Sequence, residues 1–297
     1  MTLILLSNDD GYASAGIRAL QEALAPHATV VICAPEINQS ATSHALSLHR
    51  SLRLRAVSDG VFALDGTPAD CVYVALHSGS RVLARRPGLV VSGMNHGLNL
   101  GSDVFYSGTV AAAREGAMRG IPALAVSVDA GADLAAAAAL TAQIALATIA
   151  EHAGAPRGEG DPPTEEDRLR AAATHEGGSA EAIAALPPSP FPRVPLLNIN
   201  IPRGSAWEIR ATRLGPRLYA EDVIYRRDPR GREYLWIGGT GAVRHDLLEG
   251  SDTEAFDAGI VSITPLALDI SALHHAPLAA RIAVATAKRV DASIEPR

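Results

Sequence analysis

Two acidic residues stand side by side near the start of the chain, in the segment Ser7-Asn8-Asp9-Asp10-Gly11. Adjacent carboxylates raise each other's pKa unless a positive charge compensates them, and a divalent cation can do so. Hard cations such as Mg²⁺ or Mn²⁺ prefer oxygen donors from carboxylates, amide carbonyls, hydroxyls and water. The same composition also suits a simple turn, so the pair alone leaves both interpretations open.

Two further polar residues could complete a metal site. Ser40 and Asn95 each lie in a polar segment that follows an apolar, strand-like run, as Asp9 and Asp10 do. In open α/β sheets, ligands bind beyond the carboxyl ends of the parallel strands. We therefore expect these four side chains to meet at one edge of a sheet, where together they favour a divalent metal ion over a turn.

A segment rich in glycines and hydroxyls, residues 92–116, offers a phosphate site. Its first glycines recur every four residues, which is not the G-x-G-x-x-G spacing of a dinucleotide fold. Ser107-Gly108-Thr109 opens an alanine-rich helix, where backbone N–H groups and two hydroxyls could bind phosphate at the positive end of the helix dipole. A plain N-cap role for Ser107 or Thr109 is the alternative, and it stays open.

The elements that must position these residues alternate between strands and helices over the first 130 residues. Apolar β-branched runs predict strands, while helical spacing and a Thr-Pro start predict helices. The repeated order predicts an α/β fold with a Rossmann-like, doubly wound, mostly parallel sheet. The predicted strands are 3–6, 29–33, 51–57, 61–64, 89–92 and 123–128, and the predicted helices are 16–24, one starting at 67–68, 109–119 and 134–150.

The composition changes at Ala153. Residues 153–195 hold eight of the nineteen prolines and few large apolar side chains, which predicts a disordered insertion in one domain built from 1–152 and 196–297. Beyond it we expect an antiparallel C-terminal extension and a final helix at 278–289. The predicted strands of this part are 196–201, 208–214, 221–227, 234–237 and 260–263.

Residues 205–240 of the extension are a candidate for oligomer contacts. Five aromatic side chains are grouped there: Trp207, Tyr219, Tyr225, Tyr234 and Trp236. Grouped aromatics and arginines are typical of interface centres. They could instead cover the sheet of their own subunit.

Composition and charge exclude several classes of protein. The formal net charge of −6 argues against stable nucleic-acid binding. Lys288 is the only lysine, so Walker-type phosphate loops and lysine nucleophiles are excluded unless Lys288 itself serves. Cys33 and Cys71 lack metal-ligand spacing and are expected to be buried free thiols. The alanine-rich stretch 134–150 predicts a packed helix rather than a membrane span, and without a signal peptide we expect a cytoplasmic protein.

Six sequence blocks resemble the SurE survival-protein family. They are Leu-Leu-Ser-Asn-Asp-Asp-Gly at 5–11, Ala-Pro…Asn-Gln-Ser at 34–40, Gly-Thr-Pro-Ala-Asp-Cys-Val at 66–72, Val-Ser-Gly-Met-Asn-His-Gly-Leu-Asn-Leu-Gly at 91–101, Tyr-Ser-Gly-Thr-Val-Ala-Ala-Ala at 106–113 and Val-Ser-Ile-Thr-Pro-Leu at 261–266. The resemblance implies a metal-dependent phosphomonoesterase that hydrolyses nucleoside monophosphates as a 5'- and 3'-nucleotidase. It also implies one divalent cation (Mg²⁺, Mn²⁺ or similar) per subunit and a homodimer or homotetramer.

The resemblance also assigns roles to single residues. Asp9 and Asp10 match the family's metal and catalytic carboxylates, Ser40 matches its hydroxyl ligand and Asn95 its amide ligand. The phosphate-binding set is Asn99, Ser107, Gly108 and Thr109. The chain departs from the family pattern in its long 153–195 insertion, in His96 and in Ile260, and none of these departures removes a metal ligand.

Other phosphate-handling classes fit less well. A receiver domain needs a phosphoacceptor aspartate where Asn95 stands and a lysine that the chain lacks there. A haloacid-dehalogenase-like phosphatase needs D-x-D, whereas Asp9 and Asp10 are adjacent. A catalytically silent nucleotide- and metal-binding scaffold and a phosphatase acting mainly on short polyphosphate remain as alternatives.

Overall fold

The computed structural model describes residues 1–154, 191–217, 223–237, 248–271, 275 and 277–283. The chain divides into two units. The first comprises residues 1–155 and 194–266 and contains every strand that is described, and the second comprises 156–193 and 267–297, with helical residues at 277–283. Most of the predicted insertion and half of the predicted final helix lie outside the described residues, so both stay predictions.

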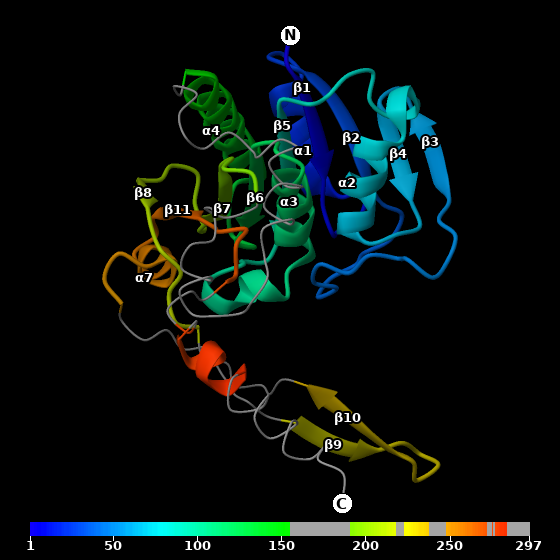
Figure 1. Cartoon of the computed structure of the whole chain (residues 1–297), viewed down its shortest axis with the longest axis vertical. Helices are drawn as coiled ribbons and strands as arrows, with labels where there is room; N and C mark the ends of the chain where they lie inside the picture. Colours follow the sequence, from blue (N-terminus) through cyan, green and yellow to red (C-terminus); the bar gives the residue numbers. More distant parts are fainter. Residues whose placement is uncertain (155–190, 218–222, 238–247, 272–274, 276, 284–297) are drawn as a thin grey trace, which may run out of the picture. The chain divides into compact units, whose positions relative to one another are not determined.

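Nine strands form one sheet in the order β3-β4-β2-β1-β5-β6-β7-β11-β8, and β9 and β10 form a separate hairpin (Figure 1). The strands are β1 (Leu3–Ser7), β2 (Thr29–Pro35), β3 (Leu54–Ser58), β4 (Val61–Leu64), β5 (Leu89–His96), β6 (Ala123–Val128), β7 (Leu196–Ile201), β8 (Ile209–Ala211), β9 (Val223–Arg227), β10 (Glu233–Ile237) and β11 (Val261–Pro265). The predicted strands of both halves are therefore present.

The central strands are parallel, as predicted. Parallel pairing runs through six adjacent strands, in the order β4-β2-β1-β5-β6-β7. At one edge, β3 pairs antiparallel with β4 as a hairpin. Antiparallel pairing appears in the C-terminal half between β7 and β11 and within the β9–β10 hairpin. β7 itself continues the parallel sheet and β8 pairs in parallel with β11, so the antiparallel part is smaller than the sequence suggested.

The helices are α1 (Ala15–Leu24), α2 (Pro68–His77), α3 (Gly108–Met118), α4 (Leu134–Gly154) and α7 (Asp252–Asp257), with short 3-10 turns η1 (Gly79–Arg81) and η2 (Gly101–Phe105). α2 begins as predicted: Thr67 and Asp70 form a capping box, with Pro68 at the first helical position. The six-residue α7 has no counterpart among the predicted helices, because so short a helix carries little periodicity.

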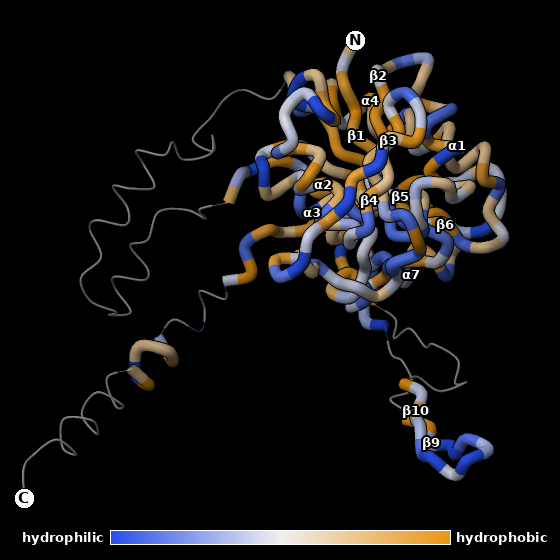
Figure 2. Tube along the Cα trace, turned by 90° about the vertical axis from the view of Figure 1, so that its right-hand side faces the viewer, coloured by the Kyte–Doolittle hydropathy of each residue, from blue (hydrophilic) through white to orange (hydrophobic). Residues whose placement is uncertain are grey.

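The period of two along each strand sends its side chains to opposite faces of the sheet. On one face, Ile4 and Leu6 of β1 belong to the same buried core as Ile17 and Leu20 of α1 and the alanines of α4. On the other face, α2 and α3 pack against each other, and α3 packs on β5 and β6. Figure 2 shows the apolar residues that run along these central strands.

The alanine-rich helix α4 is long and apolar enough, by length and composition alone, to cross a membrane. Here it packs against α1, with Ala137, Ala138, Ala142 and Ala145 in the core. That matches the packed helix expected from the sequence. Cys33 and Cys71 are both buried free thiols, also as expected.

The strand order explains where a site can form. β1 pairs with β2 on one side and with β5 on the other. The chain therefore changes direction across the sheet at β1, and ligands of open α/β sheets bind at such a switch point, beyond the carboxyl ends of the strands. Asp9 and Asp10 follow β1, while Asn95 lies at the end of β5.

Candidate active site

Asp9 is locked between strand β1 and the start of helix α3. Its side chain is nearly buried, with 4% of the residue exposed. Oδ1 accepts a hydrogen bond from Thr109 Oγ1 at 2.7 Å, and Oδ2 accepts one from the Thr109 backbone N–H at 3.2 Å. The Asp9 carboxylate therefore occupies the positive end of the α3 dipole.

Gly108 makes this close approach possible. A Cβ atom at position 108 would lie 2.9 Å from Asp9 Cβ and 3.0 Å from Pro68 Cγ. Backbone and side chain are too tightly packed there for any larger residue without a shift. Gly108 therefore allows Asp9 to pack against the start of α3, whether or not a ligand is bound.

Hydrogen bonds reach both adjacent carboxylates, but no described cationic side chain neutralises them. Burial raises the pKa of Asp9, hydrogen bonds from Thr109 oppose that shift, and the negative charge of Asp10 raises it further. Among the residues that the structure describes, no arginine or histidine forms an ion pair with Asp9 or Asp10. A pair of carboxylates held this way favours a bound cation.

Asp10 and Ser40 are connected through Asn38. Asp10 Oδ1 accepts from Asn38 Nδ2 at 3.1 Å, and Asn38 Oδ1 accepts from Ser40 Oγ at 2.7 Å and from the Ser40 N–H at 2.9 Å. The Gln39 N–H also donates to the Asp9 carbonyl oxygen at 2.7 Å. The loop after β2 is therefore joined to the loop after β1, as the strand-end argument predicted.

Asn95 reaches the same edge from β5. Its amide nitrogen donates to the Gly97 carbonyl at 2.6 Å, so the amide oxygen is the atom left to act as a donor to a metal. The next residue, His96, donates its backbone N–H to Asp10 Oδ2 at 3.2 Å, and its side chain is exposed. The unusual His96 thus bonds to Asp10 through an atom that any residue except proline would supply.

The phosphate loop has a more specific geometry than its sequence indicated. Thr109 uses both its hydroxyl and its N–H on Asp9, and the Val110 N–H donates to Ser107 Oγ at 3.1 Å. Ser107 is therefore the N-cap of α3, the alternative left open above. Because its oxygen accepts that bond, its own hydroxyl proton still has to find an acceptor, and a phosphate oxygen would suit it.

Asn99 is placed differently from the other three residues of the predicted phosphate-binding set. It is 7% exposed, and its amide nitrogen donates to Ser127 Oγ at 2.8 Å. Its backbone N–H donates to Asn200 Oδ1 at 2.8 Å, and its carbonyl accepts from Asn198 Nδ2 at 2.7 Å. Asn99 thus joins the loop after β5 to strands β6 and β7, and its contact with phosphate stays a prediction.

The donor set fits a hard divalent cation. Two carboxylates and a hydroxyl come from the loops after β1 and β2, an amide oxygen comes from the end of β5, and all are oxygen donors of the kind that Mg²⁺ and Mn²⁺ prefer. Across the described ranges, no three His, Cys, Asp or Glu side chains converge as a metal site. Any metal at this edge would therefore depend on Ser40 and Asn95 for its further protein ligands.

Two features of the site were not found from the sequence. Asn38, the bridge between Asp10 and Ser40, lies between two strand-end residues with no pattern that distinguishes it. Thr109 was assigned to phosphate, whereas its observed contacts are with Asp9. The signal for the second was present, since a hydroxyl at a helix start can serve whichever acceptor the neighbouring strand supplies.

Comparisons with known proteins identify the family of the chain. A family model described as Survival protein SurE matches residues 4–221. The chain is 60% identical over 281 residues to "5'-nucleotidase SurE" of Sorangium cellulosum (strain So ce56), with 95% of each chain covered. It is 40% identical over 274 residues to "5'-nucleotidase SurE" of Geobacter sulfurreducens, covering 90% of this chain and 88% of that protein. The crystal structure of the SurE protein from Aquifex aeolicus superposes with a TM-score of 0.67 at 33% identity, covering 92% of this chain and 96% of that one.

Proposed function

The chain belongs to the survival protein SurE family, and on that premise we propose that Asp9, Asp10, Ser40 and Asn95 hold one divalent metal ion in a nucleotidase site. The protein is a 5'-nucleotidase, which hydrolyses nucleoside monophosphates to nucleoside and phosphate. The observation that carries the metal proposal is a pair of adjacent carboxylates without a described cationic partner, of which Asp10 is linked through Asn38 to Ser40. Activity toward 3'-phosphates stays a prediction.

Some of the site residues are assigned to the metal ion and others to the phosphate group of the substrate. When bound, a divalent cation would act as a Lewis acid on a phosphoryl oxygen and would offset the negative charge of the transition state. Thr109 fixes the Asp9 carboxylate in one orientation through two hydrogen bonds. The Ser107 hydroxyl and the Gly108 N–H are the donors we assign to the phosphate oxygens at the start of α3.

Phosphate release from AMP by chelator-treated protein, with and without added Mn²⁺, tests this function. We expect turnover only with metal, and a loss of at least about 100-fold in Asp10→Asn because one charged ligand becomes neutral. Asp59→Asn, an exposed aspartate in the β3–β4 turn, is the matched control. Metal-independent turnover, or near-normal turnover of Asp10→Asn at saturating Mn²⁺, contradicts the proposal.

We propose that the β9–β10 hairpin provides subunit contacts in a homodimer or homotetramer. Both of its faces carry apolar side chains, because Tyr225 lies opposite Leu235 and Ile224 lies opposite Trp236. Tyr225 and Trp236 are each 62% exposed. A two-stranded hairpin is marginally stable by itself in water, and exposed apolar patches of this kind mark interfaces.

Trp207 covers the core of its own subunit and is not part of the proposed interface. It packs against the core of its own chain, and its Nε1 donates to the Pro202 carbonyl at 2.9 Å. Tyr219 lies outside the described residues. The interface proposal therefore rests on the aromatic residues of the hairpin alone.

The interface proposal has its own test. The double variant Tyr225→Ala, Trp236→Ala should sediment as a smaller species than the wild type. If the partner's hairpin borders the nucleoside side of the site, KM for AMP should rise more than KM for a small artificial phosphate ester. A wild type that sediments as a monomer at micromolar concentration and hydrolyses AMP normally overturns this part.

We also propose a cytoplasmic location, and that residues 153–195 are dispensable for the chemistry. Their replacement by a short Gly/Ser linker should keep metal-dependent turnover within about threefold, because every residue assigned to the site lies outside them. Complete loss of activity in a folded deletion variant would place part of the site in that segment.

A further inference from the structure

The loop that carries Ser40 has an unfavourable backbone. Ala41 and Ser43 have φ values of 59° and 52°, in the left-handed region that residues with a Cβ atom rarely occupy. Such conformations persist only where surrounding contacts determine them, and they cluster at functional sites. Ser40 itself is exposed, so burial of its own side chain does not hold the loop.

Contacts beyond Ser40 hold the loop in this shape. The Ser43 N–H donates to the Tyr106 carbonyl at 3.0 Å, and Ser43 Oγ donates to the Phe105 carbonyl at 2.7 Å. One residue further on, His44 Nε2 lies 3.0 Å from Glu115 Oε2. The first two contacts attach the loop to η2, and the third attaches it to helix α3.

Glu115 is a buried carboxylate with two partners. Its side chain is 1% exposed, and besides His44 it binds both Nε and Nη2 of Arg119, each at 2.9 Å. Burial alone would raise the pKa of Glu115, but hydrogen bonds and positive charge from His44 and Arg119 lower it overall. A buried, ionised carboxylate keeps its partners in place, because losing one leaves a charge uncompensated.

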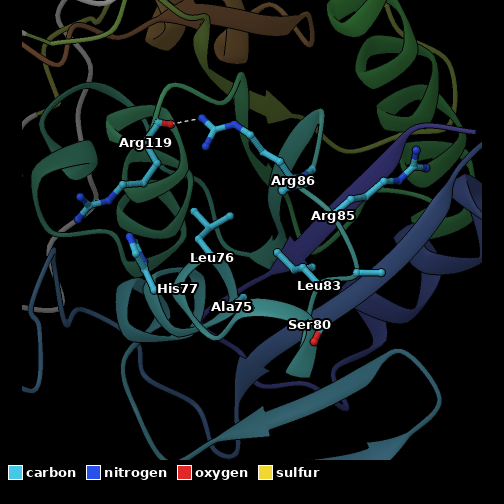
Figure 3. Close-up of a pocket in the computed structure, with 11 residues that line it drawn as sticks. Ala75, Leu76, His77, Ser80, Leu83, Arg85, Arg86 and Arg119 are labelled. Atoms are coloured by element: carbon cyan, nitrogen blue, oxygen red, sulfur yellow. Dashed lines mark hydrogen bonds between the residues drawn. The ribbon is translucent and has the colours of Figure 1, made fainter. Parts of the chain in front are cut away.

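A cavity beside the C-terminal ends of α2 and α3 does not form an anion-binding site. It has a volume of about 400 Å³ and lies beside η1 and the last turns of α2 and α3. Figure 3 shows the side chains of Arg85, Arg86 and Arg119 pointing in different directions. They bind the Met1 carbonyl, the Arg119 carbonyl and Glu115, respectively, so they do not converge on a common anion.

We infer that His44 is a positioning residue of the nucleotidase: its contact with Glu115 holds the strained Ala41–Ser43 turn and thereby the Ser40 hydroxyl on Asn38, the residue that binds Asp10. The inference rests on the proposed metal site. His44 lies four residues from Ser40 and acts through the loop backbone. Ser40 is in turn joined to Asp10 through Asn38, so a loop that keeps its Ser43 contacts but loses Glu115 shifts the register of that bridge.

The test measures Mn²⁺ binding by isothermal titration calorimetry to chelator-treated full-length protein. We expect His44→Ala to bind Mn²⁺ about tenfold more weakly, the range for residues that orient metal ligands. In turnover assays the Mn²⁺ concentration for half-maximal rate should rise by the same factor, while kcat at saturating Mn²⁺ stays within about threefold. His44→Gln, whose amide can occupy the Nε2 position, should restore the affinity.

Two further variants separate positioning from general stability. His27→Ala, an exposed histidine after α1, is the control and should bind Mn²⁺ like the wild type. Ala41→Gly removes the left-handed strain, so in the His44→Ala background it should recover part of the lost affinity. If His44→Ala does not fold, His44→Asn repeats the test with a polar side chain too short to reach Glu115.

The outcomes separate this inference from the function on which it rests. A wild type that binds no Mn²⁺ overturns the proposed metal site and the inference with it. A wild type that binds one Mn²⁺ per chain, with His44→Ala or His44→Asn binding equally well, overturns the inference alone. Equal losses in folded His44→Ala and His44→Gln also overturn it.

Discussion

Asp9 and Ser40, two of the proposed metal ligands, are held by opposite means. Asp9 directly follows a central strand, is 4% exposed and is bound at both carboxylate oxygens by the first turn of α3. Ser40 is exposed, stands in a loop with left-handed residues and bonds to its own neighbour Asn38. One side of the site is therefore built by regular secondary structure, and the other by side-chain contacts of a loop.

The two sides of the site differ in how far they can vary. The Asp9 side cannot move without moving β1 or α3, because Gly108 already lets the helix approach to contact distance. The Ser40 side can move if a few polar contacts break. We expect substitutions on the first side to abolish activity and substitutions on the second to tune metal affinity.

Substitution of Asp9 should reduce activity far more than substitution of Ser40. Asp9→Asn removes a charged donor and places an amide against Thr109, so kcat/KM for AMP should fall by roughly 1000-fold. Ser40→Ala removes one neutral donor that water can replace, so the loss should be about tenfold and should shrink with added Mn²⁺. Steady-state phosphate release over a range of Mn²⁺ concentrations measures both. Equal losses in the two variants would erase the distinction.

The next prediction concerns Thr109, which holds Asp9 in place. Thr109→Val keeps the shape but deletes the hydroxyl that donates to Asp9 Oδ1 at 2.7 Å. Mn²⁺ affinity should fall by about 10- to 100-fold, as expected when the partner of a metal ligand is lost. Thr109→Ser keeps the hydroxyl and should stay close to the wild type. If Thr109→Val instead raises KM for AMP with Mn²⁺ affinity unchanged, Thr109 serves phosphate after all.

The smallest effect concerns the anchor of the loop side and appears in stability. The pKa of Glu115 in the folded protein lies below its ordinary value of 4.5. Its ionised form therefore stabilises the fold fully above that value, and the contribution is lost as pH falls through the lower, folded pKa. Between about pH 5 and pH 3, the free energy of unfolding should fall more steeply in the wild type than in Glu115→Gln.

Urea unfolding at several pH values measures this contribution. Because many carboxylates titrate in the same range, the difference between the two proteins is the quantity to compare. Parallel curves would mean that the ionised Glu115 does not stabilise the fold, and the loop anchor would lose its electrostatic basis.

The two sides also differ in how far the sequence could predict them. The apolar runs Leu3–Leu6 and Leu89–Ser92 predict parallel strands. Because the carboxyl ends of parallel strands share one edge of the sheet, Asp9, Asp10 and Asn95 could be placed on that edge from the sequence. Ser40 could be placed on that edge in the same way. Periodicity says nothing about the path of a loop, so the bridge through Asn38 required the structure.

Contacts between side chains that are distant in sequence could not be predicted from local sequence patterns either. His44 and Glu115 are 71 residues apart, and nothing local to either residue indicates the other. Thr109 could be placed at a helix start but not given an acceptor, because a cap hydroxyl accepts or donates according to what the fold brings near it. The parallel pairing of β7 with β6 was missed because the intervening segment hid the strand–helix–strand order.

Binding of Mn²⁺ by the isolated protein depends on Asp9 and Asp10 if these residues hold the metal. Titration of chelator-treated wild type with Mn²⁺, followed by the electron paramagnetic resonance signal of the free ion, should show one ion bound per chain. The Asp9→Asn, Asp10→Asn double variant should keep its fold by circular dichroism and bind none. A double variant that still binds one Mn²⁺ per chain with wild-type affinity would place the metal elsewhere and contradict the site described here.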